Sequence, residues 1–89
     1  MYKLKKDTWL VKIISLFGFD AITLGSTIHI KGELAENKRL LNHEKCHVEQ
    51  FKDYGFIRFV FTYVWYSTLY GYKNNPFEIE ARKSEVQTE

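Results

Sequence analysis

Apolar side chains near the N-terminus recur with the period of a helix. They are spaced three and four positions apart and consist of Trp9, Leu10, Ile13, Ile14 and Phe17. Asp7 and Thr8 are good N-cap residues in front of this run, and Gly18 is a residue that ends helices. The pattern therefore predicts a short amphipathic helix over residues 9–17.

The next segment loses the helical period and is rich in β-branched residues. Over residues 21–31 these are Ile22, Thr23, Thr27, Ile28 and Ile30. Gly25 interrupts the segment and Gly32 closes it, so the pattern predicts two short strands or one bulged strand. His29 falls in the alternating part, where we expect an exposed or edge position.

A second helical period begins at about residue 36 or 37 and ends at residue 54, because Gly55 stands where C-cap glycines are favoured. At about 100° per residue, one broad face collects Leu40, Leu41, His43, Glu44, His47, Val48, Phe51 and Tyr54. Polar side chains occupy the other face. The helix is therefore predicted to turn both histidines and Glu44 inward.

Residues 56–72 hold about half of the aromatic side chains in the chain. This segment is apolar all round, which predicts the buried central helix of a small domain, although its aromatic and β-branched content leaves a strand open. It is shorter than the roughly 20 residues of a membrane span. An interfacial or partner-facing role is the alternative to burial.

Asn75 and Pro76 predict the start of a last helix, because a capping residue is followed by proline at the first helical position. A helix over residues 77–87 is expected, with a polar tail after Ser84. The helices and short strands together predict an α+β fold, and 89 residues suffice for one domain over residues 1–89.

Charge and cysteine content narrow the function classes. A formal net charge of +2 is too small to indicate a nucleic-acid partner, and the only basic cluster, Lys3, Lys5 and Lys6, is expected to be a solvated end. The single Cys46 excludes an internal disulfide framework. No clear secretory signal is present, because Lys12 interrupts the first apolar run, so we expect a cytoplasmic location.

The sequence His43-Glu44-Lys45-Cys46-His47 is an HExxH motif. Residues four apart share one face of a helix, so both imidazoles can reach one metal ion while Glu44 stands beside them as a base. Catalytic zinc sites use three protein ligands and leave a fourth position open. Glu78 and Glu80 are the candidates for the third ligand, and periodicity does not choose between them.

The HExxH helix followed by a helix with a glutamate resembles zinc metallopeptidases of the zincin group whose third ligand is Glu. Their downstream signature, Glu-x-x-Ala-Asp or Glu-x-x-Ala-Asn, falls on residues 78–81 and favours Glu78. The chain also resembles short bacterial and phage domains with HExxHxxQ and Asn-Pro-aromatic-Glu-x-Glu-Ala, matched by residues 43–50 and 75–81. These matches are specific at the two motifs and weak elsewhere.

The resemblance implies a minimal zincin-like metallopeptidase with Zn²⁺ on His43, His47 and Glu78. Glu44 would be the general base toward a zinc-activated water that attacks a peptide bond of a peptide or protein substrate. The substrate strand would lie along an edge strand, for which residues 27–31 are the candidate. The candidates for stabilising the oxyanion are Tyr63, Tyr66, Tyr70, Tyr72 and His29.

One position departs from the zincin pattern. The Asp or Asn that follows Ala and often orients a ligating histidine is Arg82 here, and arginine cannot accept that hydrogen bond. Another group, for which Glu85 is a candidate, must orient the imidazole, or the site binds metal more weakly. Gln50 is expected to pack or hydrogen-bond near the site, and Cys46 to be a small packed side chain.

A second hypothesis needs no catalysis. Zinc would only stabilise a small domain, and the aromatic residues 56–72 would bind a membrane surface or a partner protein. The shortness of the chain favours this alternative, because little material is left to build substrate pockets.

Overall fold

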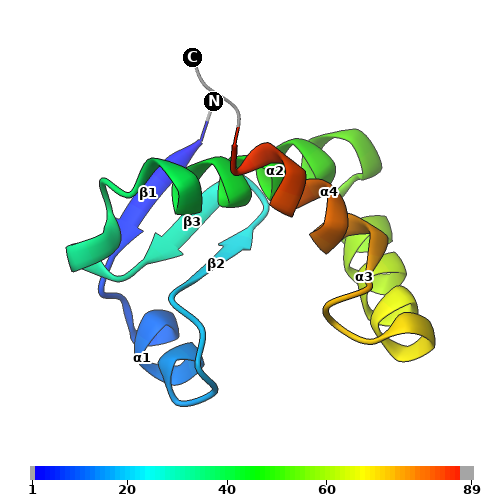
Figure 1. Cartoon of the computed structure of the whole chain (residues 1–89), viewed down its shortest axis with the longest axis horizontal. Coiled ribbons are helices and arrows are strands. Elements are labelled where there is room, and N and C mark those ends of the chain that lie inside the picture. Colours follow the sequence, from blue (N-terminus) through cyan, green and yellow to red (C-terminus); the bar gives the residue numbers. More distant parts are fainter. Residues whose placement is uncertain (1, 87–89) are drawn as a thin grey trace.

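The computed structural model describes residues 2–86, which form a small sheet and four helices (Figure 1). The α+β class predicted from the sequence is confirmed. In chain order the elements are β1 (Lys3–Lys6), α1 (Trp9–Ser15), β2 (Ala21–Leu24), β3 (Thr27–Ile30), the 3-10 turn η1 (Gly32–Leu34), α2 (Lys38–Tyr54), α3 (Phe56–Tyr70) and α4 (Pro76–Ser84).

The sheet has the order β1-β3-β2. Of the two predicted alternatives, two short strands are present and one bulged strand is not: β2 and β3 form an antiparallel hairpin whose turn uses Gly25 at a φ of +63°. Strand β1 was not predicted. It pairs in parallel with β3, from Lys3 opposite Thr27 to Lys6 opposite Ile30, while all four of its side chains are exposed. The expected solvated end is therefore correct for its side chains and wrong for its backbone.

Pairing with β1 makes β3 the central strand, so residues 27–31 do not provide a sheet edge. The predicted substrate strand is wrong for this reason, and β2 is the terminal strand on the side of α2. His29 is likewise not at an edge. It is half-buried in β3, and its Nδ1 lies 3.0 Å from the Thr8 hydroxyl at the start of α1.

Helix α2 covers the sheet with its apolar face. Asn37 caps its N-terminus by accepting a hydrogen bond from the Leu40 backbone N–H (3.1 Å), and Gly55 ends it at a φ of +85°. Val48 packs on Ile28 and Ile30 of the central strand. Glu44 and His47 are buried, as the helical period predicts.

Asn75 fixes the start of α4 against α3. Its Oδ1 accepts from the Phe77 backbone N–H (2.9 Å), while its side-chain amide donates to the Tyr63 carbonyl (3.0 Å) and the Ser67 hydroxyl (2.9 Å). Phe77 joins Phe51 and Phe59 in a second core between α2, α3 and α4. Helix α4 ends at Ser84, earlier than expected, and Gln87 lies outside the described residues.

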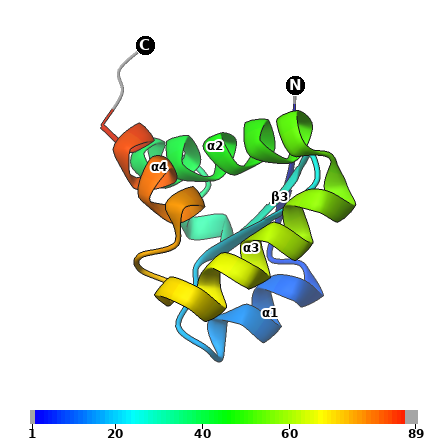
Figure 2. The ribbon, with the colours of Figure 1, turned by 90° about the vertical axis from the view of Figure 1, so that its right-hand side faces the viewer.

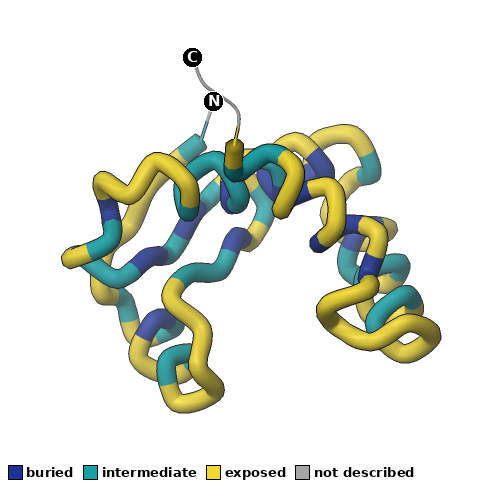
Figure 3. The backbone as a smooth tube through the Cα atoms, viewed as in Figure 1, coloured by how far each residue is buried: buried dark blue, intermediate teal, exposed yellow. Residues whose placement is uncertain are grey.

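Helix α3 forms, but the expectation that it is buried is wrong. Phe59 is its only buried residue, whereas Phe61 is 72% exposed and Trp65 60% exposed. One side of α3 packs on α2 and α4, and α3 stands across from α1 on the same side of α2 (Figures 1 and 2). The remaining faces of both helices are uncovered by any described part of the chain (Figure 3). None of the described helices has the length and hydropathy to cross a bilayer.

Candidate metal centre

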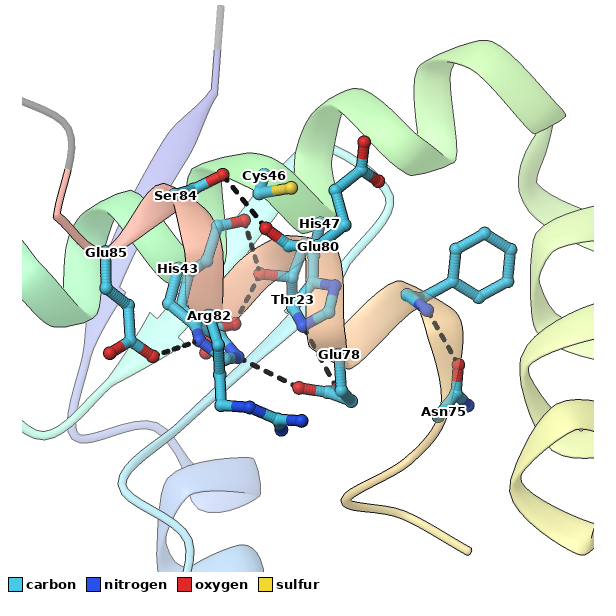
Figure 4. A network of polar contacts seen from close by, with 12 residues as sticks. Thr23, His43, Cys46, His47, Asn75, Glu78, Glu80, Arg82, Ser84 and Glu85 are labelled. Atoms are coloured by element: carbon cyan, nitrogen blue, oxygen red, sulfur yellow. Dashed lines mark hydrogen bonds and ion pairs between the residues drawn. The ribbon is translucent and has the colours of Figure 1, made fainter. Parts of the chain in front are cut away.

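Three side chains from α2 and α4 converge on one point. The Nε2 atom of His43 lies 2.9 Å from Glu78 Oε1, and that of His47 lies 3.1 Å from Glu78 Oε2. The three potential ligand atoms all lie within 4.8 Å of one another, so the group could hold a metal ion. Figure 4 shows both imidazoles of α2 pointing toward the Glu78 carboxylate.

The helix geometry separates the two candidate glutamates. Glu78 lies in the first turn of α4 and is 4% exposed, facing the histidines. Glu80 is two residues further on and points to another side, where it accepts a hydrogen bond from the Gln50 amide at 2.7 Å. The structure therefore brings Glu78, and not Glu80, to the histidines.

The Nδ1 atom of each imidazole, on the ring side away from Glu78, contacts a second side chain. His43 Nδ1 lies 2.6 Å from Glu85 Oε2, and His47 Nδ1 lies 2.8 Å from Gln50 Oε1. When Nδ1–H donates to these oxygens, the Nε2 lone pair of each ring is left facing the ligand cluster, which is the tautomer that a metal requires. Glu85 thus occupies the role expected of the missing Asp or Asn.

Arg82 does not hydrogen-bond to either histidine of the cluster. Its guanidinium donates to the Lys73 carbonyl in the loop before α4, and the residue is exposed. Gln50, in contrast, ties α4 to α2. Its Nε2 donates to the Phe77 carbonyl (3.1 Å) and to Glu80, while its Oε1 accepts from His47. Cys46 contacts this amide at 3.6 Å and does not line the cleft described below.

Glu44 sits beside the ligand cluster in a buried position, 6% exposed. Burial raises the pKa of its carboxyl group, against the opposing effects of His47 and of a hydrogen bond from Thr23. The Thr23 hydroxyl of β2 donates to Glu44 Oε1 at 2.7 Å. Thr23 was missed by sequence reasoning, because an inward threonine in a short strand looks like any other β-branched core residue.

Burial, hydrogen bonds and opposite charges together set the pKa values of Glu78, His43 and His47. Burial opposes ionisation of Glu78, but hydrogen bonds from His43 and His47 hold its pKa well below the usual range. Burial alone would lower the pKa of each histidine, and the hydrogen bonds to Glu78 reverse this, so both pKa values are raised. The Tyr63 hydroxyl also donates to Glu78 Oε2, at 2.6 Å. Protons and a metal ion therefore compete for the same nitrogen atoms.

A cleft of about 430 Å³ lies next to His43, His47 and Glu78, between α1, β2 and α3. His43, Glu44, His47 and Glu78 form its polar end, and its walls are mainly apolar. Of the five candidates for stabilising an oxyanion, Tyr63 and Tyr72 line this cleft, whereas His29, Tyr66 and Tyr70 do not. Tyr63 donates to Glu78 at 2.6 Å, whereas Tyr72 has a weaker hydrogen-bonding interaction with the same carboxylate, so Tyr72 is the more available donor.

Tyr72 also connects the two sides of the cleft. Its ring meets that of Phe19 edge-on, with centroids 5.4 Å apart, so the segment after α3 touches the segment after α1. Burial and the nearby Glu78 and Glu44 carboxylates raise the pKa of Tyr72 to about 12. Its hydroxyl group therefore stays protonated near neutral pH and can donate a hydrogen bond into the cleft.

Comparisons with protein-family models, with curated proteins and with solved structures give no match for this chain. The zincin resemblance therefore remains a prediction from two sequence motifs. The candidate metal centre depends instead on the geometry of its three ligand side chains, their two hydrogen-bond partners and the adjoining cleft.

Proposed function

We propose that this chain is a zinc-dependent metallopeptidase with a minimal zincin-like fold. His43, His47 and Glu78 would hold Zn²⁺, and Glu44 would be the general base. The observation that carries the proposal is the convergence of two imidazole Nε2 atoms and one carboxylate beside a second, buried carboxyl group at the end of a cleft.

The donor set fits a catalytic zinc ion. Two imidazoles and one carboxylate are the ligands of several zinc hydrolases, and three protein ligands leave the fourth position for water or substrate. Glu85 and Gln50 hold the Nδ1 atoms, as the partners of ligating histidines do in known zinc sites. When bound, Zn²⁺ acidifies water toward a pKa of about 7 and polarises a carbonyl group.

Glu44 is suited to accept and return a proton. Because burial raises its pKa, its carboxylate is more basic than an exposed glutamate and closer to neutral pH, where acid–base catalysis works best. The Thr23 hydroxyl donates to Oε1 of Glu44, so Oε2 of Glu44 is the atom that would accept the proton. Tyr72 is the candidate donor to the oxyanion that develops on the attacked carbonyl.

The substrate strand is assigned to β2 in place of residues 27–31. Strand β2 is terminal in the sheet, and all of its residues, from Ala21 to Leu24, line the cleft. An extended peptide can add to such an edge through backbone hydrogen bonds. The apolar walls contributed by Phe51, Phe59 and Val60 favour a large apolar side chain next to the scissile bond.

The test separates catalysis from metal binding. Glu44→Gln should keep the zinc content of the wild-type chain and lose cleavage of an apolar peptide library, because the ligands remain and the base is gone. If wild-type protein with one bound zinc cleaves nothing in that library, and chelation unfolds it outright, the non-catalytic zinc-stabilised domain is the correct account.

A further inference from the structure

The cleft lies between two helices whose outer faces are apolar. Helices α1 and α3 extend to the same side of α2 (Figures 1 and 2), and residues on and directly after each of them line the cleft. Both carry large apolar side chains that are more than half exposed. Six of those on α3 and on or directly after α1 are called here the apolar rim: Trp9, Leu16, Phe17, Ile57, Phe61 and Trp65.

The two segments that carry the apolar rim contain only positive charges. Residues 8–19 contain Lys12 as their only charged residue, and residues 54–77 contain only Arg58 and Lys73. All 11 acidic residues of the chain lie outside these two segments. Two of them, Glu49 and Asp53, are exposed on the outer face of α2, which is turned away from the cleft. The two helical segments are thus apolar and cationic, and the acidic residues lie outside them, with Asp20 directly after the first segment and Glu44 and Glu78 at the inner end of the cleft.

This combination matches an anionic lipid surface better than it matches a second copy of the chain. Two copies docked through the same face would bring Lys12, Arg58 and Lys73 toward like charges, which opposes association. An anionic bilayer attracts the same cations, and exposed tryptophans beside aliphatic side chains are the residues that settle at the headgroup level. Exposed apolar surface of this kind marks an interaction site.

We propose that the apolar rim docks the protein on the surface of an anionic bilayer. The α1 and α3 side chains would enter the headgroup region while α2 and the sheet stay in water. Helix α3 has 15 residues, fewer than a span needs, so the contact is interfacial. Docking does not depend on catalysis. If the proposed peptidase activity also holds, the cleft between the docked helices would lie close to the bilayer and receive peptides bound at the membrane surface.

The two tryptophans of the chain, Trp9 and Trp65, both belong to the apolar rim and are 69% and 60% exposed. The wild-type chain is mixed with vesicles of equal parts phosphatidylcholine and phosphatidylglycerol, and separately with vesicles of phosphatidylcholine alone. We expect a blue shift of tryptophan emission and co-flotation with the anionic vesicles only. Unchanged emission with both vesicles, or equal binding to both, would overturn the proposal.

Charge variants identify the docking face. Lys12→Glu with Arg58→Glu should weaken vesicle binding at least about tenfold, because each cation near an anionic surface contributes to binding. Lys38→Glu with Lys83→Glu is the matched control, since it changes net charge equally at exposed positions outside the rim segments and should bind like the wild type. Equal losses in both variants would contradict the proposal. So would a stable dimer in solution whose formation alone shifts the tryptophan emission.

Discussion

Glu85 Oε2 lies 2.6 Å from Nδ1 of His43, a contact made between the end of α4 and the middle of α2. It replaces the partner that an Asp or Asn after Ala81 would supply, at the position where this chain has Arg82. The same carboxylate also accepts a hydrogen bond from the exposed Arg39 side chain at 3.2 Å. His43 is therefore oriented by a residue seven positions after the third ligand candidate, Glu78.

Replacing Glu85 should weaken zinc binding without removing it. Glu85→Ala leaves all three candidate ligands in place but releases the His43 ring, and loss of such a partner typically costs about 10–100-fold in metal affinity. Competition with a chromophoric chelator measures the change. Arg39→Ala removes only the exposed partner of Glu85 and should stay near wild type. Wild-type affinity in Glu85→Ala would show that this contact has no role in the site.

Replacing Thr23 should shift the acid limb of the pH–activity profile. Its hydrogen bond lowers the pKa of Glu44, so Thr23→Val raises that pKa further above the ordinary value. A general base must be ionised, and activity disappears as pH falls through its pKa, so the acid limb of the kcat/KM profile should move to higher pH. Thr27→Val on β3 serves as control. An acid limb that stays in place or moves lower contradicts the role of Glu44.

Tyr72 and Tyr63 should differ in what their hydroxyl groups do. Tyr72→Phe removes the candidate oxyanion donor and should lower kcat by about 10²-fold, with a smaller change in zinc affinity than Tyr63→Phe because its interaction with Glu78 is weaker. Tyr63→Phe removes the hydrogen bond to Glu78 and should instead weaken zinc binding. Steady-state kinetics and chelator competition on both variants make the distinction. If the two variants behave alike, the assignment of separate roles is wrong.

Zinc should stabilise the fold more strongly as pH rises. In the metal-free protein, the raised histidine pKa values stabilise the fold below about pH 6.5, and that contribution is lost as pH rises through them. The lowered Glu78 pKa contributes stability above about pH 4.5 that is lost in stronger acid. The metal-free chain should therefore be most stable between these values, while zinc binding improves as the imidazoles lose protons.

Thermal unfolding followed by circular dichroism checks this dependence. The difference in Tm between zinc-loaded and chelator-treated protein should grow from pH 5.5 to pH 8. A difference that is constant or shrinks over this range would mean that His43 and His47 do not exchange protons for metal.

The sequence predicted those parts of the fold whose side chains follow one period from end to end. Helix α2 is the main example, because its start near residue 37, its end at Gly55 and its inward face are all local features. The choice of Glu78 over Glu80 came from a motif, and the structure explains it through the turn of α4, which directs Glu80 to Gln50.

The errors arose where contacts between distant segments decide the outcome. All four side chains of β1 are exposed, so the sequence has no apolar pattern that would indicate a strand there. Because β1 was not predicted, β3 was expected at the edge of the sheet, whereas it is the central strand. Helix α3 is apolar all round, yet burial needs partners on each side, and this short chain covers only the side near Phe59 and Phe77. Thr23 joins the site only because β2 passes beside Glu44.

In the proposed site, His43, His47 and Glu78 together hold Zn²⁺. The most direct test is the zinc content and zinc affinity of the dialysed wild-type chain, Glu78→Ala and Glu80→Ala. We expect one zinc per chain in the wild type and in Glu80→Ala, and severe loss of binding in Glu78→Ala. Wild-type affinity in Glu78→Ala, or an equal loss in Glu80→Ala, would contradict it.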